Sequence, residues 1–111
     1  MTWKNDALQH AKDCLPNESC GLVIKVDGKM QYKCCENISS KPELSFVINP
    51  LQWAEIEDSG DELIAVVHSH PEGDIKPSDT DLKSCNDLGL DFYICSPTRG
   101  DWYNFSPTST S

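Results

Sequence analysis

Basic residues are scarce in this sequence. Its 111 residues include 9 lysines and arginines against 18 aspartates and glutamates, which gives a formal net charge of −9. Nucleic-acid backbones and anionic lipid surfaces are bound by clustered basic side chains, so this balance argues against both as partners. A basic or polar substrate, or a protein partner, fits the charge better.

Long hydrophobic runs are missing as well. No apolar run approaches the roughly 18 residues that a membrane span needs. The first ten residues, MTWKNDALQH, have neither the basic start nor the apolar middle of a signal peptide. We therefore expect no membrane span. We also expect a protein that stays in a reducing compartment such as the bacterial cytoplasm, or leaves it by a route that needs no signal.

The six cysteines lack the C-x-x-C spacing that is typical of structural zinc sites. Cys34 and Cys35 are adjacent, so on a strand they face opposite sides. We interpret the cysteines as small buried hydrophobic residues in a protein whose thiols stay reduced.

Local patterns predict one domain with the element order α-β-β-β-α-β-α-β-β, which is typical of an α/β (α+β) fold with a three-layer mixed sheet. Asp27-Gly28 indicates a hairpin turn, Asn49-Pro50 a helix start and Gly89 a helix end. The helices are expected over residues 3–13, 49–58 and 78–89, and the strands over residues 20–26, 29–35, 43–48, 62–70, 91–97 and 101–107. We assign residues 1–106 to the domain and residues 107–111 to a flexible Ser/Thr tail or the start of a linker.

Three side chains in the stretch VVHSHPEGDIKPSDTD have the chemistry of metal ligands. His68 and His70 are two residues apart on a predicted strand, so both rings point to the same side. Asp81, in the first turn of the next predicted helix, can complete the set. Two histidines and one carboxylate leave a fourth tetrahedral position for water, which is typical of catalytic zinc. Such a zinc lowers the pKa of its water and polarises a carbonyl.

Two further residues have side chains suited to catalysis beside such a metal. A hydrolase needs a carboxylate that moves protons without binding the metal. Glu18 is a candidate, because it lies in a turn of small residues, ESCGLV, that leads into a strand. Ser78 could donate a hydrogen bond to the developing oxyanion.

A second interpretation of the same stretch needs no metal. SDTD also matches a capping box, in which Ser78 caps the helix and Asp81 reaches back to the backbone of Ser78. We expect Asp81 to fill only one of the two roles, and the residues alone leave the choice open. The remaining histidine, His10, lies on the polar face of the first predicted helix, where we expect it to be solvated and without a role.

The string HSHPEGDIKPSDTD, with Glu18 upstream, resembles the signature of the JAMM (MPN+) zinc metalloproteases. That signature consists of a glutamate, His-x-His-Pro, seven residues counted from the second histidine, and Ser-x-x-Asp. The resemblance implies a cytidine-deaminase-like three-layer fold. It implies Zn²⁺ held by His68, His70 and Asp81. Glu18 would act as general base and then general acid, and Ser78 would stabilise the tetrahedral intermediate.

Nearly the whole chain is similar to a bacteriophage and prophage branch of this family, which includes the N-terminal part of phage tail assembly protein K. Asn37, Pro42 and Phe46 stand where that branch usually has them. The resemblance implies a metallopeptidase that hydrolyses peptide or isopeptide bonds, with a ubiquitin-like protein or a cell-wall peptide as substrate and phage tail proteins as partners. It also implies the phage tail as a location. The alternative is a tail-tip assembly module whose metal site is not catalytic.

Overall fold

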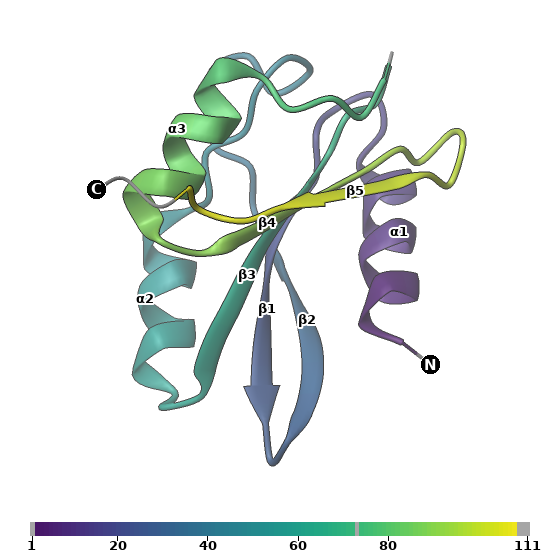
Figure 1. Cartoon of the computed structure of the whole chain (residues 1–111). Coiled ribbons are helices and arrows are strands. Elements are labelled where there is room, and N and C mark those ends of the chain that lie inside the picture. The colour runs from purple at the N-terminus through teal and green to yellow at the C-terminus, as the bar shows by residue number, and fades with distance from the viewer. Residues whose placement is uncertain (1, 73, 109–111) are drawn as a thin grey trace.

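The computed structural model describes residues 2–72 and 74–108 and contains one five-stranded mixed sheet with the strand order β2-β1-β3-β4-β5. Helices lie on both of its faces, which confirms the predicted three-layer arrangement (Figure 1). The elements are α1 (Trp3–Cys14), β1 (Cys20–Val26), β2 (Lys29–Cys35), α2 (Pro50–Asp58), β3 (Glu62–Ser69), α3 (Asp79–Leu88), β4 (Asp91–Cys95) and β5 (Trp102–Phe105).

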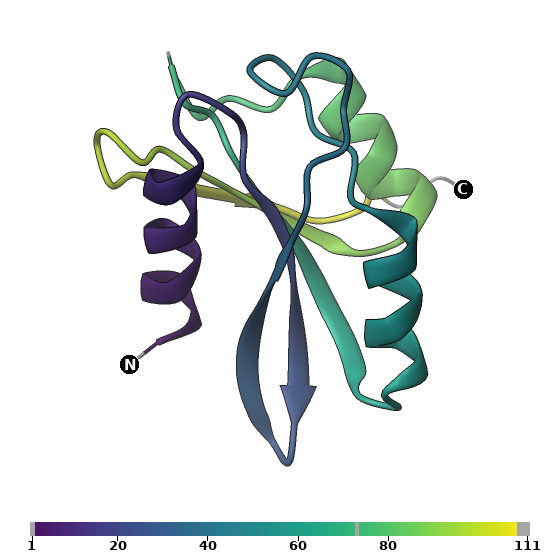
Figure 2. The same cartoon turned by 180° about the vertical axis from the view of Figure 1, so that it is seen from behind.

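Two hydrophobic clusters fill the space between the layers. Helix α1 covers one face of the sheet, whereas α2 and α3 lie on the other face (Figure 2). Neighbouring strand residues face opposite layers, so Val23 and Val67 pack in the cluster with Ala7 of α1, and Leu22 and Val66 pack in the cluster on the other side. The central strands therefore have apolar residues on both faces, as their near-continuous hydrophobic sequence predicts.

The pairing of β3 determines which residues meet at the end of the sheet. Strand β1 runs antiparallel to β3 with Cys20 opposite His68, and β4 runs parallel to β3 with Ile94 opposite His68. The start of β1 and the end of β3 therefore lie side by side. Helix α3, which connects the parallel strands β3 and β4, begins near this same end of the sheet (Figure 1).

The predicted turn and helix signals have the geometry that their residues favour. Asp27 and Gly28 have φ angles of 50° and 80° between β1 and β2, as a tight type I′ hairpin turn requires. The Asn49 side chain accepts a hydrogen bond from the N–H of Leu51 at the start of α2. Gly89 ends α3 in the left-handed conformation, with φ of 67°.

The prediction of a strand over residues 43–48 is wrong. This segment is irregular, and its one bridge joins Ile48 to Asn37. Its backbone groups have other partners: the N–H of Val47 donates to the side chain of Asn37 at 3.0 Å rather than to a neighbouring strand. The β-rich sequence therefore forms a loop, and the chain has one strand fewer than predicted.

His10 is also not the solvated residue that its position on α1 predicts. Its ring is half-buried, and Nδ1 lies 2.6 Å from the hydroxyl of Tyr32 on β2. Burial lowers the pKa of His10, although the nearby Asp13 acts in the opposite direction. The hydrogen bond connects α1 to the edge strand of the sheet, so His10 helps to hold the first helix in place.

The cysteines largely follow the expectation from the sequence. All six are free thiols, and Cys20, Cys35, Cys85 and Cys95 are buried. Cys34 is exposed on the opposite side of β2 from Cys35, as adjacent strand residues must be.

The end of the described chain lies against α3. The N–H of Thr108 donates to the side chain of Asn86 at 2.8 Å, so the first part of the predicted tail has a partner on the domain. Residues 109–111 of that tail lie outside the described residues. Among the described helices, none has the length and apolar character to cross a bilayer.

We expect Gly21→Ala to lower the free energy of unfolding by about 2 kcal/mol, because overpacking a filled core forces its neighbours apart. A Cβ atom at Gly21 would lie 2.5 Å from the carbonyl oxygen of Lys33 and 2.5 Å from the ring of Tyr32. Gly28→Asn is the matched control, because the space around Gly28 is open and asparagine tolerates positive φ. Urea unfolding measures both variants, and equal losses of stability would contradict this account.

Candidate metal centre

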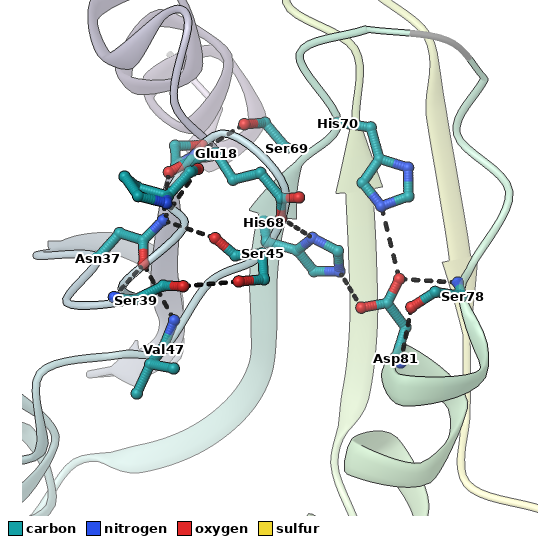
Figure 3. Close-up of polar contacts among 12 residues, drawn as sticks. Glu18, Asn37, Ser39, Ser45, Val47, His68, Ser69, His70, Ser78 and Asp81 are labelled. Carbon is teal, nitrogen blue, oxygen red and sulfur yellow. Dashed lines mark hydrogen bonds and ion pairs between the residues drawn. The ribbon is translucent and has the colours of Figure 1, made fainter.

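The five residues singled out in the sequence come together at one end of the sheet (Figure 3). Glu18 lies two residues before β1, and Ser78 and Asp81 lie at the start of α3. His68 is near the end of β3, and His70 follows that strand. The antiparallel register of β1 and β3 brings Glu18 to the side of His68, and the loop after β3 returns the chain so that α3 faces both histidines.

Distances among the three predicted ligands suit a metal ion. Asp81 Oδ1 lies 3.3 Å from His68 Nε2, and Asp81 Oδ2 lies 3.5 Å from His70 Nε2. Bonds of about 2.0–2.1 Å at tetrahedral angles place neighbouring ligand atoms about 3.3 Å apart. One ligand atom from each residue lies within 4.8 Å of the others. Both carboxylate–histidine separations are long for hydrogen bonds and close to the distance expected between neighbouring metal ligands, with a different oxygen of Asp81 nearest to each histidine.

The buried state of His68 independently favours a metal. Its side chain is fully buried between the rings of Phe46 and Phe92, and neither ring nitrogen has a hydrogen-bond partner among the described residues. Buried polar groups nearly always have a partner, because an unpaired one loses its hydration without compensation. A cation coordinated by His68 would supply the missing interaction.

His70 is oriented by a contact behind its ring. Its Nδ1 lies 3.0 Å from the carbonyl oxygen of Asp74, so Nδ1–H donates and Nε2 is directed at Asp81. A hydrogen bond of this kind on the second nitrogen fixes the tautomer of metal-binding histidines. The contact with Asp81 raises the pKa of His70, and burial opposes it.

Asp81 forms the predicted capping box, and its geometry does not exclude the ligand role that we expected to compete with it. Its Oδ2 accepts a hydrogen bond from the N–H of Ser78 at 2.9 Å, and its own N–H donates to Ser78 Oγ at 3.0 Å, so the capping box forms. At the same time the carboxylate faces His68 and His70. The two roles are compatible because a carboxylate has two oxygens and about four lone-pair sites. Burial raises the pKa of Asp81, but His70, His68 and Ser78 outweigh it and lower the pKa to about 2.

The remaining two candidates line the opening of the site. The Glu18 carboxylate is nearly buried, and Oε1 lies 3.5 Å from His68 Nδ1, on the opposite side of the ring from Asp81. Ser78 uses its oxygen as an acceptor in the cap, which leaves its hydroxyl hydrogen free to donate. Both residues line a cleft of about 490 Å³ together with His70 and Asp81.

Several cleft residues were not identified as site residues from the sequence. The ring of Phe46 stacks on His68 with centroids 4.3 Å apart and planes at 22°. Phe46 belongs to the segment that its composition assigns to a strand, so nothing local indicated this contact. The other residues of the cleft wall are Pro16, Glu43, Leu44, Ser45, Pro71, Glu72 and Thr80. Apart from Thr80, which lies in α3, they come from loops, whose arrangement in space leaves no periodic signal in the sequence.

Comparison with known proteins gives three relatives at the level of sequence. Tail tip assembly protein K of Escherichia phage N15 is 34% identical over 100 residues, which is 90% of this chain and 41% of that protein. A desampylase of Haloferax volcanii is 28% identical over 89% of this chain and 82% of its own length. A UPF0758 protein of Chlorobium chlorochromatii is 32% identical, and this chain spans 50% of it. The chain therefore spans about half or less of the length of two of these relatives.

Solved structures show the same fold. A protein from Desulfitobacterium hafniense superimposes with a TM-score of 0.71 at 25% identity, covering 92% of this chain and 76% of that one. A JAB1/MPN domain protein from Archaeoglobus fulgidus gives a TM-score of 0.62 at 22% identity, covering 93% and 81%. A structure described as a JAMM metalloprotease-like zinc site gives 0.59 at 19% identity, covering 93% and 80%.

The family assignment rests on most of the chain. Residues 3–107 match the Prok-JAB family, described as prokaryotic homologs of the JAB domain. This range includes every element of the sheet, its three helices and all five candidate site residues. The chain belongs to the Prok-JAB family, the prokaryotic homologs of the JAB domain.

Proposed function

We propose that this protein is a zinc-dependent metallopeptidase that hydrolyses a peptide or isopeptide bond. The observation that carries the proposal is the fully buried His68, whose ring nitrogens have no hydrogen-bond partner among the described residues and face the carboxylates of Asp81 and Glu18. His68 lies beside a cleft that Glu18, His70 and Asp81 line, so the two histidines and Asp81 could form a metal ligand set while Glu18 remains as a separate proton carrier.

His68, His70 and Asp81 would hold the zinc ion. Zinc bound there would supply an acidified water and a Lewis acid for the scissile carbonyl. Glu18 would accept the proton of the attacking water and then give it to the leaving amine, because its carboxylate lines the same cleft as His70 and Asp81. The hydroxyl of Ser78 would donate to the oxygen of the tetrahedral intermediate.

The relatives support a protein substrate and a phage setting. Desampylase is the name of one relative, and tail tip assembly protein that of another. Accordingly, we propose a peptide or a ubiquitin-like conjugate as substrate, phage tail proteins as partners, and the virion tail or bacterial cytoplasm as location. Residues 1–106 would form the catalytic domain and residues 107–111 a tail or linker start.

A second candidate function is a tail-tip assembly module with a non-catalytic metal site, which the relationship to tail tip assembly protein K favours. An assembly role needs the metal ligands at most, whereas hydrolysis also needs Glu18. A Glu18→Gln variant that supports tail assembly as well as the wild type does would favour this second function.

Replacing His68 tests the ligand set. We expect His68→Ala to reduce the zinc content of the purified protein from about one ion per chain to well below one, because a three-residue set loses its central ligand. His10→Ala is the matched control, since His10 bonds Tyr32 and lies outside the cleft. Mass spectrometry of the metal content measures both variants, and a full complement of zinc in His68→Ala would refute the ligand assignment.

Replacing Glu18 tests the proton carrier. We expect Glu18→Gln to keep its zinc and to lose turnover by a factor on the order of 10²–10⁴, because glutamine has a similar size but cannot carry the proton. Cleavage can be followed as new amino groups released from peptide and isopeptide-linked substrates by zinc-loaded protein. Wild-type turnover in this variant would show that another group moves the proton.

Replacing Ser78 separates its two roles. At a helix N-cap, alanine costs about 1 kcal/mol of stability and glycine only a few tenths. We therefore expect Ser78→Gly to remain nearly as stable as the wild type, and Ser78→Ala to be less stable. Both should lose turnover by roughly 10²-fold, because both lack the oxyanion donor. If Ser78→Gly keeps full turnover, the hydroxyl serves only the cap. Thermal unfolding and initial rates measure the two effects.

A further inference from the structure

One side chain outside the cleft bonds to both Glu18 and the loop that forms the cleft wall. Asn37 follows β2, and its carboxamide is surrounded by the backbone of two segments (Figure 3). Its Nδ2 donates to the carbonyl oxygens of Glu18 and Ser45, both at 3.0 Å, and Oδ1 accepts from the N–H groups of Ser39 and Val47, both at 3.0 Å. A carboxamide has two N–H hydrogens and two acceptor lone pairs. All four are therefore used.

The loop from Ser39 to Val47, which we call the wall loop, pairs with no strand among the described residues, and Leu44 within it is 77% exposed. Its internal hydrogen bonds join Lys41 to Leu44 and Ser45 and the Ser39 hydroxyl to that of Ser45. Ser45 and Phe46 of this loop line the cleft, and Phe46 stacks on the ring of His68. The Asn37 carboxamide adds bonds to both ends of the wall loop and links it to Glu18, which the internal bonds do not.

The backbone of Glu18 is held by the same set of contacts. Its N–H donates at 2.7 Å to the carbonyl oxygen of Pro42 in the wall loop, and its carbonyl accepts from Asn37. Glu18 precedes β1, so no ladder hydrogen bonds hold it in the sheet. The next N–H, that of Ser19, donates to the hydroxyl of buried Ser69. The backbone from which the Glu18 side chain projects is thus held by hydrogen bonds to the wall loop and to Asn37, and Ser69 holds the neighbouring Ser19.

We propose that Asn37 is a positioning residue, whose carboxamide holds Glu18 and the wall loop in one arrangement so that proton transfer and substrate contact occur at a fixed geometry. The catalytic part of this inference rests on the proposed function, whereas the positioning itself does not. Asn37 lines no part of the cleft and acts only through the backbone that it bonds. Only an amide can donate to the two carbonyls and also accept from the two N–H groups. A carboxylate has no donor for the carbonyls, and a hydroxyl is too short to reach both segments.

Three variants separate positioning from general stability of the loop. Asn37→Asp has the same shape but turns an acceptor toward the carbonyls of Glu18 and Ser45. Asn37→Ser removes the amide without adding a negative charge near Glu18, and it carries the test if Asn37→Asp does not fold. Ser39→Ala is the matched control: it removes hydrogen bonds of the Ser39 hydroxyl to Ser45 and Lys41 within the wall loop, and that hydroxyl makes none to Glu18.

Hydrogen exchange measured by NMR tests positioning without a substrate. We expect the amides of Glu18 and Val47 to exchange at least tenfold faster in the Asn37 variants, while the amide of Val67 in β3 keeps its protection. In Ser39→Ala the amide of Glu18 should exchange as in the wild type. Unchanged exchange at Glu18 in the Asn37 variants would overturn the inference, and so would equal acceleration in Ser39→Ala.

Steady-state kinetics of the zinc-loaded proteins test the catalytic consequence. A small misplacement of a reacting group costs up to about 10²-fold in rate. We expect kcat to fall by roughly 10- to 100-fold in the Asn37 variants at full zinc content, with a smaller change in KM, and Ser39→Ala to keep the wild-type kcat. If kcat is unchanged in the Asn37 variants while Glu18→Gln is inactive, the inference on Asn37 fails and the proposed function stands. If Glu18→Gln is as active as the wild type, another group moves the proton. If the zinc-loaded wild type cleaves none of the peptide and isopeptide substrates, the proposed function fails. In both cases hydrogen exchange still decides whether Asn37 positions Glu18.

Discussion

The antiparallel register of β1 and β3, with Cys20 opposite His68, is the constraint on which the site depends. It brings the residues before β1 to the residues at the end of β3, and so places Glu18 beside His68 although the two are far apart in the chain. A shift of one residue would turn every side chain of the strand to the other face of the sheet. The side chains of β3 are close-packed in the clusters on both faces of the sheet, so a shift would disrupt both, and packing of the core thereby also fixes the chemistry at this end of the sheet.

Much of this arrangement could be predicted from the sequence, because the signals are local. His68 and His70 share a side through the period of a strand, Ser78 and Asp81 begin a helix, and the Asp27-Gly28 turn joins a hairpin. Each depends on neighbours within a few residues. The proximity of Glu18 to His68 is different, since it depends on strand pairing across the sheet. The sequence suggested Glu18 only through its turn of small residues before a strand and through resemblance to a family.

The errors arose where tertiary contacts replaced a local preference. Residues 43–48 have the composition of a strand, but side-chain hydrogen bonds from Asn37 satisfy part of their backbone and no strand pairs with them. His10 occupies a polar helix position and is nevertheless half-buried, because Tyr32 reaches it from β2. The choice between cap and ligand for Asp81 was posed too narrowly, since one carboxylate has enough oxygen lone pairs for both.

The place of Asp81 in the capping box has a thermodynamic consequence for the proposed metal site. Its carboxylate is held by the first turn of α3, so Asp81 would serve as the proposed third ligand only when that helix has formed. Ligand binding that requires the folded state adds to its stability through linkage, by about 1.4 kcal/mol for each tenfold increase of free ligand above its dissociation constant. If Asp81 binds the ion as proposed, folding of α3 and affinity for the ion would be coupled, and a substitution that weakens the first turn of that helix would also lower the affinity.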